Sequence, residues 1–250
     1  MYGDVFMDPV SWSEQTIGLD VYDISDIPDN SATGDLHQPD LLWEFELDGG
    51  FVTSRKKGDI VYLIARHTPR IPGYDDYPAF DQAESNQSAL ETVTSEDLLP
   101  KASINNEAVD FLNSTDCLKI NENHNAATDA VDYGYPTMTL LVAINIAEQT
   151  IENSTCFLET THGVYVSQEA VYFIQQEGWA DNSKSFIHKF DLNEELAYTG
   201  SGEVQGHLTG RGQVDFRINE YDGYVRVVTS EWTGNNEDAQ DHRLTVLQQS

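Results

Sequence analysis

The chain has 250 residues, 39% of them hydrophobic, which is enough to bury a substantial core and excludes disorder of the whole chain. Thirteen Lys and Arg against 43 Asp and Glu give a net charge of −30 at pH 7, which repels phosphate backbones and argues against nucleic acid as a partner. No apolar run approaches the roughly 20 residues of a membrane span, and the first residues lack the pattern of a signal peptide. Adaptation of the surface to salt explains this acidity better than capture of divalent cations.

Short apolar runs separated by turn residues follow one another along the chain. They are rich in Val, Ile, Tyr, Phe and Thr and are bounded by Gly, Asp and Asn, which is typical of β-strands. The runs lie at 18–24, 41–47, 59–65, 138–146, 164–167, 170–174, 185–192, 214–218, 224–229 and 243–247. The sequence therefore predicts an all-β chain.

Several of these predicted strands are apolar at odd and even positions alike, as in VYLIA at 61–65 and AVYFI at 170–174. Both faces of such strands must be covered. Four connections have the length and composition of hairpin turns, at 47–51, 55–59, 166–170 and 219–224. Hairpins join antiparallel neighbours, so the pattern indicates antiparallel sheets packed on sheets, either in a sandwich stack or as propeller blades.

A repeated unit of four strands favours the β-propeller. The unit predicts three four-stranded antiparallel blades and the start of another, at about 16–67, 137–178, 184–230 and 243–250. Closed propellers have about 4 to 8 blades, so this count predicts an open arc or a fragment of a larger ring.

Residues 68–136 interrupt this repeat as an insertion, which we expect to lie over a rim or side of the propeller. Ser95 followed by Glu96 and Asp97 is typical of the start of a helix, and Pro100 prevents a long one, so one short helical turn is predicted. Arg66 and Arg70 stand at the entrance of the insertion, close to His67, Tyr74, Tyr77 and Phe80. Arginine beside aromatic residues is common in recognition surfaces, although the favoured interpretation is that these rings only fix the insertion to the blade.

Five segments of the chain are similar to a known family, and the first and third of them along the chain are VYDISD at 21–26 and SEDLLP at 95–100. FVTSRKKGDIVYLIAR at 51–66, IHKFDL at 187–192 and above all GEVQGHLTGRGQVDFRINEYDGYVRVVTSEW at 202–232 resemble secreted bacterial and archaeal proteins with a β-propeller domain distantly related to WD40 repeats. The resemblance covers most of residues 16–250 in order. It implies an extracellular, periplasmic or cell-surface protein whose remaining blades lie elsewhere in the full-length chain.

The two cysteines of the chain, Cys117 and Cys156, stand before the second predicted blade and near its first inner strand. An exported protein would oxidise such a pair, so we expect a disulfide, with two buried free thiols as the alternative.

Sequence motifs for catalysis and metal binding are missing. There is no nucleophile elbow or P-loop, and the seven histidines stand singly, so no catalytic residue and no metal site is predicted. Two acidic loops offer oxygen atoms to calcium, through Asp23, Asp26 and Asp29 and through Glu237, Asp238 and Asp241. Ordinary capping of turns by Asp is the favoured interpretation, so no cofactor is expected.

Candidate binding residues are the cations that lie in or beside predicted strands, and one histidine. Arg55, Arg66 and Arg226 stand out because basic residues are scarce, although ion pairs with neighbouring carboxylates are the favoured interpretation. His188 shares a strand face with Phe186 and Phe190, which favours a packed, hydrogen-bonded histidine over a catalytic one.

Two functions remain open at this level. The favoured one is a non-catalytic binding or scaffolding module of an exported protein, which takes a protein, peptide or glycan at loops on one rim. The alternative is a hydrolase- or lyase-type enzyme whose polar residues converge in the propeller funnel only after folding.

Overall fold

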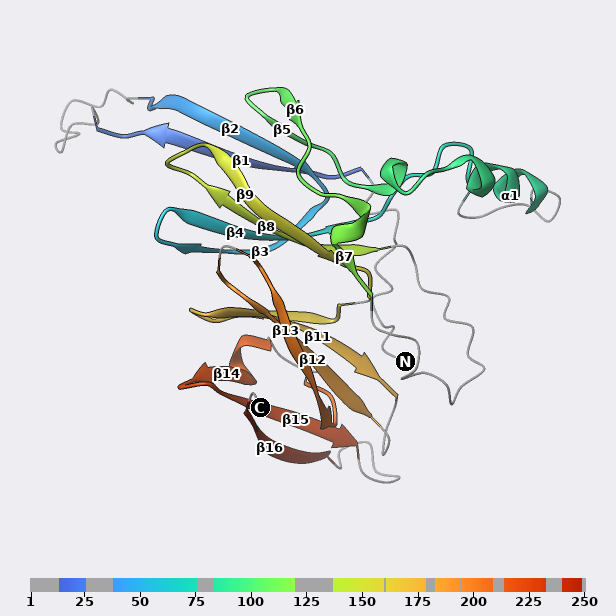
Figure 1. Cartoon of the computed structure of the whole chain (residues 1–250). Helices are drawn as coiled ribbons and strands as arrows, with labels where there is room; N and C mark the ends of the chain where they lie inside the picture. The colour runs from blue at the N-terminus through green and yellow to red at the C-terminus, as the bar shows by residue number, and fades with distance from the viewer. Residues whose placement is uncertain are drawn as a thin grey trace.

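The described residues form four β-sheets that stack face to face, as the computed structural model in Figure 1 shows. The structure describes residues 14–25, 38–75, 83–119, 137–159, 161–178, 183–193, 195–208, 214–232 and 240–248. The prediction of an all-β fold built of propeller blades is confirmed. In this part of the chain the single α-helix is α1 (Ala83–Thr92), which lies beside the stack.

The first two sheets contain the strands of the N-terminal half. The first has the order β1 (Thr16–Asp23), β2 (Asp40–Asp48), β5 (Ala102–Ile104) and β6 (Glu107–Val109). The second has the order β3 (Gly50–Lys57), β4 (Ile60–His67), β8 (Met138–Asn145), β9 (Thr150–Phe157) and β7 (Cys117–Leu118). All neighbours in these two sheets are antiparallel except β7 and β9.

The other two sheets are antiparallel meanders in chain order. The third is β10 (Gly163–Val166), β11 (Ala170–Glu177), β12 (Lys184–Asp191) and β13 (Tyr198–Gln205). The fourth, called the last sheet below, is β14 (Ile218–Tyr221), β15 (Tyr224–Trp232) and β16 (Gln240–Gln248). In the part of the chain that the structure describes, three short 3-10 helices lie at Glu96–Leu98, Ser114–Asp116 and Val214–Phe216. The first of these is the predicted helical turn.

Three apolar layers hold the four sheets together. In β4, Leu63 and Ala65 face the first sheet, whereas Tyr62 and Ile64 face the third. The third sheet divides its strand β11 in the same way, since Phe173 packs toward the second sheet and Tyr172 toward the last. The prediction that these strands are covered on both faces is therefore correct. Because each layer lies between two sheets, the first and last sheets each keep one face without a described neighbouring sheet.

The predicted blade boundaries are out of phase with the observed sheets. The strands of predicted blade 16–67 divide between the first and second sheets, and those of 137–178 between the second and third. Likewise, the strands of 184–230 divide between the third and last sheets. The four-strand period is right, but each sequence unit joins two strands of one sheet to two strands of the next.

The origin of this error is the connection at 47–51, which is not a hairpin. Gly49 takes φ of +135° and leads the chain from β2 in the first sheet into β3 in the second. A Cβ at this position would lie 2.6 Å from the carbonyl oxygen of Arg66, so only glycine permits the close crossing. The other three predicted hairpins form, between β3 and β4, β10 and β11, and β14 and β15.

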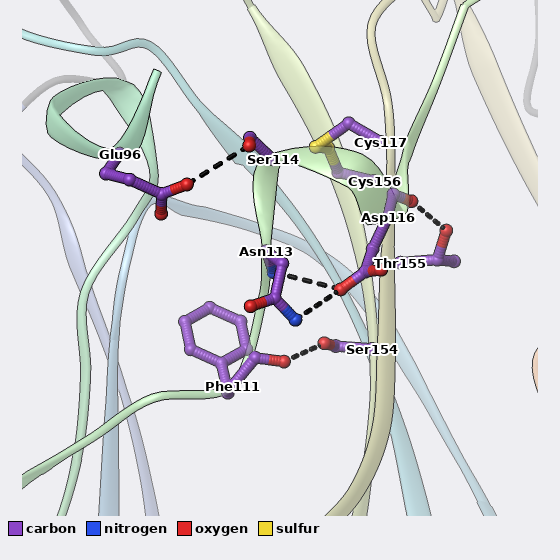
Figure 2. The surroundings of a disulfide bond; sticks show 9 residues. All are labelled: Glu96, Phe111, Asn113, Ser114, Asp116, Cys117, Ser154, Thr155 and Cys156. Carbon is purple, nitrogen blue, oxygen red and sulfur yellow. Dashed lines mark hydrogen bonds between the residues drawn. A yellow bond between two sulfur atoms is a disulfide. The ribbon is translucent and has the colours of Figure 1, made fainter. Parts of the chain in front are cut away.

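The insertion is built into the sheets and does not simply cover a rim. It supplies β5 and β6 to the first sheet and β7 to the second. Figure 2 shows how residues 111–117 are attached to β9. A disulfide joins Cys117 to Cys156 with their Cα atoms 4.4 Å apart, Thr155 donates to the Asp116 carbonyl at 2.9 Å, and Ser154 donates to the Phe111 carbonyl. The insertion therefore closes the edges of two neighbouring sheets.

Candidate functional site

The uncovered side of the last sheet is the most distinctive surface of the described residues. Alternation along its strands sends Ile218, Val225 and Val227 into the layer shared with the third sheet. Their strand neighbours face the opposite way. We call this opposite side the outer face of the last sheet, and we define it by Phe216, Arg217, Tyr221, Arg226, Leu244 and Val246.

Large apolar side chains of this face are open to solvent. Phe216 is 85% exposed, Tyr221 68%, Leu244 65% and Val246 55%. A hollow of about 340 Å³ lies beside Phe216 and Leu244 and is lined by Tyr165, Phe216, Arg217, Ile218, Asn219, Arg226, Val228 and Leu244. Contiguous exposed apolar surface is typical of a site that another molecule covers.

Hydrogen bonds hold the arginines of this face in place. The Arg226 guanidinium lies 5.6 Å from the centre of the Tyr221 ring and donates to the Asn219 side-chain oxygen at 3.1 Å. Arg217 donates to the Ser230 hydroxyl at 2.8 Å. Both charges are therefore positioned before any ligand arrives, which lowers the entropic cost of binding.

Ser230 also contacts a histidine. Its Oγ lies 2.8 Å from Nδ1 of His242, so the hydroxyl can donate to the ring while it accepts from Arg217. A serine nucleophile needs a base that is itself oriented by a third group. Within the described residues no carboxylate is bonded to the His242 ring, and the pair lies on an open sheet face. Ser230 and His242 therefore act here as neighbouring polar side chains, and Ser230 fixes Arg217 by accepting its hydrogen bond.

Arg55 lies at a second hollow, away from the last sheet. The hollow measures about 230 Å³ and is lined by Arg55, Lys56, Lys57, Gln168 and Glu169. Lys57 forms an ion pair with Glu169 at 3.2 Å. Strand β1 contacts β3, and β3 contacts β10. These are the first strands of the first three sheets, so Arg55, Lys56 and Lys57 of β3 lie on the side of the stack where the first strands meet.

The candidates at the entrance of the insertion have structural contacts. Arg66 is largely buried and donates to the Thr161 carbonyl, and burial lowers its pKa. Arg70 forms an exposed ion pair with Glu14 at 2.7 Å. Tyr77 and Phe80 lie outside the described residues. The structure thus separates Arg55, Arg66, Arg70 and Arg226 instead of gathering them into one site.

His188 is buried against aromatic rings. Its ring centre lies 4.9 Å from that of Phe157 and 6.4 Å from that of Tyr198. The predicted packing is correct, but the predicted hydrogen bond is absent within the described residues, since both ring nitrogens are buried without a partner. Burial lowers the pKa of His188 to about 4, which keeps the ring neutral.

The acidic loops are described only in part. Asp26, Asp29, Glu237 and Asp238 lie outside the described residues. Asp23 accepts a hydrogen bond from the Ser25 amide at 2.8 Å, and this bond lowers the Asp23 pKa. Asp23 therefore caps a turn, as its sequence context predicts. No group of three or more potential metal ligands occurs among the residues that the structure places.

Sequence reasoning found Arg226 but missed its apolar surroundings. The signal was present in RLTVL at 243–247, where Leu244, Val246 and Leu247 place apolar side chains on both faces of β16. Because β16 belongs to the last described sheet, one of these faces has no described sheet to cover it. Leu247 packs into the layer with the third sheet, and Leu244 and Val246 are left exposed. Phe216 carries no periodic signal, because it stands in a single 3-10 turn.

Stacked, mainly antiparallel sheets of three to five strands, with one face of the last described sheet open, define a protein of the propeller class. The family model of the β-propeller domain matches residues 6–250, so the chain belongs to this family. A search of curated proteins finds none that matches the chain. Among the described residues, no helix has the length and apolar character to cross a membrane.

Proposed function

We propose that this chain is a non-catalytic binding module that uses the outer face of the last sheet. The observation that carries the proposal is the exposure of Phe216, Tyr221, Leu244 and Val246 around two positioned arginines. Aromatic and arginine side chains supply most of the binding energy in protein interfaces. In this chain the inner sheets are covered by other sheets, which favours a partner that also presents a sheet.

The charge of the surface narrows the chemistry of that partner. Arg217 and Arg226 stand among apolar side chains, where a desolvated cation needs a carboxylate opposite it. The partner is therefore a protein with a flat β-sheet face that carries carboxylates. The protein is also proposed to be exported, which the Cys117–Cys156 disulfide supports and which the oxidised state of this pair in protein isolated from the producing cell tests.

A photo-crosslinking amino acid in place of Leu244 tests the binding surface in the producing cell. We expect a covalent adduct with a protein at this position, and none when the crosslinker replaces the exposed Glu152 of β9. Adding Arg226→Glu should lower the yield at position 244 at least about tenfold, because a like charge then faces the carboxylates of the partner. Equal adducts at 244 and 152, or none at either, would overturn the proposal.

A further inference from the structure

The chain contains three copies of the motif Asn-x-Ser/Thr, in which the asparagine is the acceptor of N-linked glycans in exported proteins. The copies are NQS at 86–88, NST at 113–115 and NST at 153–155. So short a motif also arises by chance, and it assigns no modification by itself. A transferase must reach the side-chain amide nitrogen, and the folded protein must leave room for a bulky sugar beside it. Exposure and hydrogen bonding therefore decide between the three positions.

Asn86 is used inside the fold. It lies in α1 and is only 8% exposed. Its Oδ1 accepts a hydrogen bond from the Asp75 amide at 2.9 Å, and its Nδ2 donates to the Asp75 carbonyl at 2.8 Å. Both ends of the side chain thus fix the helix to the preceding segment. A sugar on Nδ2 would have to break this pair of bonds.

Asn153 lies within β9, where it is half-buried and its Oδ1 accepts from the Ser154 amide at 2.8 Å. The hydroxyl residue of its motif, Thr155, is buried and donates to the Asp116 carbonyl at 2.9 Å (Figure 2). Strand β9 pairs with β8 along the whole motif. A transferase therefore reaches this motif only if the sheet opens.

Asn113 differs from both because it is exposed, and so is Thr115 of its motif. Its backbone is extended, with φ of −107° and ψ of 155°, and the 3-10 helix Ser114–Asp116 follows it directly. The motif thus forms a surface turn, as is typical of glycan acceptors. Nδ2 donates to the Asp116 carboxylate at 2.9 Å (Figure 2). An amide nitrogen carries two hydrogens and a glycan replaces one, so the other can keep this bond.

The surroundings of Asn113 leave space for a glycan. Residues 111–117 lie along β9 of the second sheet, and the first and third sheets cover the two faces of that sheet. The exposure of Asn113 is therefore that of a sheet edge and does not come from an uncovered sheet face. The third sheet separates this edge from the last sheet, as Figure 1 shows, so a glycan here leaves the outer face of the last sheet accessible.

We infer that Asn113 is a site of N-linked glycosylation and that the other two motifs are unmodified in the folded protein. The inference rests on the proposed export of the chain, because N-linked glycans belong to exported proteins. The donor is a sugar activated as a diphosphate ester. The Asn113 nitrogen bonds to the anomeric carbon, the bond from that carbon to the diphosphate oxygen breaks with its electron pair, and the amide proton passes to a base of the transferase.

Mass spectrometry of the protein isolated from the producing cell tests the inference. Trypsin cuts the reduced chain so that the three motifs lie on different peptides, at 71–101, 102–119 and 120–184. We expect a sugar mass on 102–119, and the masses of the unmodified sequence for the other two. A sugar on either of those two, or none on 102–119, would overturn the inference.

Variants that keep Asn113 itself provide the controls. Thr115→Ala and Ser114→Pro should both remove the sugar, because the motif needs a hydroxyl at its third position and excludes proline at its second. Proline suits position 114, which opens the 3-10 helix after an extended residue. Thr115→Ser preserves the motif and should retain the sugar. A sugar that persists in Thr115→Ala and Ser114→Pro would show that the motif is not its acceptor.

The same sample separates this inference from the proposed export. Cys117 lies on peptide 102–119 and Cys156 on 120–184, so before reduction an exported chain yields the two peptides joined by their disulfide. A joined pair without sugar rejects the glycosylation site and leaves export standing. Two separate peptides with reduced cysteines and no sugar reject both.

Discussion

At the scale of single residues, His188 shows how a polar group is kept inside an aromatic layer. Its ring packs between Phe157 of the second sheet and Tyr198 of its own sheet, with both nitrogens unpartnered. Such a ring is tolerated only in its neutral form, because charging it without a hydrogen-bond partner in an apolar layer costs several kcal/mol. The side chain therefore links the packing of two sheets to pH.

His188 should make the protein acid-sensitive. Its pKa falls from 6.5 in the unfolded chain to about 4 in the folded protein, so the unfolded chain takes up the proton first. Stability from the neutral ring is complete above about pH 6.5 and is lost as the pH falls toward 4, by at most about 3 kcal/mol. His188→Leu should remove most of this loss, as measured by denaturant unfolding between pH 7 and pH 4.5.

The exposed His242 offers a matched control for this experiment. His242→Leu, which removes an exposed imidazole from the last sheet, is unfolded over the same pH range as the comparison for the loss of a histidine. An unchanged pH dependence in His188→Leu would show that carboxylates, and not this ring, dominate the acid response.

At the scale of elements, the disulfide and its hydrogen bonds fix the insertion to β9 (Figure 2). The disulfide spans 39 residues, a separation at which cross-linking removes substantial entropy from the unfolded chain. Cys117→Ala/Cys156→Ala should lower the free energy of unfolding by about 2 to 4 kcal/mol, measured with denaturant.

A hydrogen bond in the same segment gives the comparison for the disulfide. Ser154→Ala removes only the contact with the Phe111 carbonyl and should cost about 1 kcal/mol. If a reductant left the melting temperature of the wild type unchanged, the insertion would be held by its strands β5 to β7, and the predicted role of the disulfide would be wrong.

Most strands were predictable from sequence because each carries its own local signal. Strands such as β4, β8 and β11 are apolar at successive positions, and turns such as Asp222 and Gly223 have positive φ, which suits tight hairpins. Short pieces such as β5 and β7 carry no such signal. They are strands only because β2 and β9 leave an edge to pair with, which is information from tertiary structure.

At the scale of the whole molecule, the sequence repeat indicates how many strands form a sheet, but it does not indicate at which strand each sheet begins. The assignment of β2 and β3 to one sheet or two depends on the backbone of Gly49, which a hydrophobic pattern does not encode. The candidate site has the same limitation. Arg217 and Leu244 come from segments far apart in the chain, and only the register of β14 to β16 places them on one face.

The charge of the molecule predicts that salt stabilises it. The described ion pairs with exposed partners, such as Lys57–Glu169 and Arg70–Glu14, involve few of the 43 acidic residues, so repulsion among carboxylates dominates. Raising the salt from about 0.1 M to about 1 M shortens the screening length from about 10 Å to about 3 Å. The gain of about 1 kcal/mol that we expect raises the melting temperature by about 2 to 4 °C.

The wild-type chain is measured at low concentration, so that association adds nothing to the melting temperature. NaCl, MgCl2 and CaCl2 at equal ionic strength separate screening from calcium binding by the acidic loops. Since Asp23 already caps a turn, we expect CaCl2 to match MgCl2. A larger rise with CaCl2 that a chelator reverses would contradict this expectation and assign a calcium site to the loops. A melting temperature that falls with NaCl would show that attractive pairs outweigh the repulsion between carboxylates.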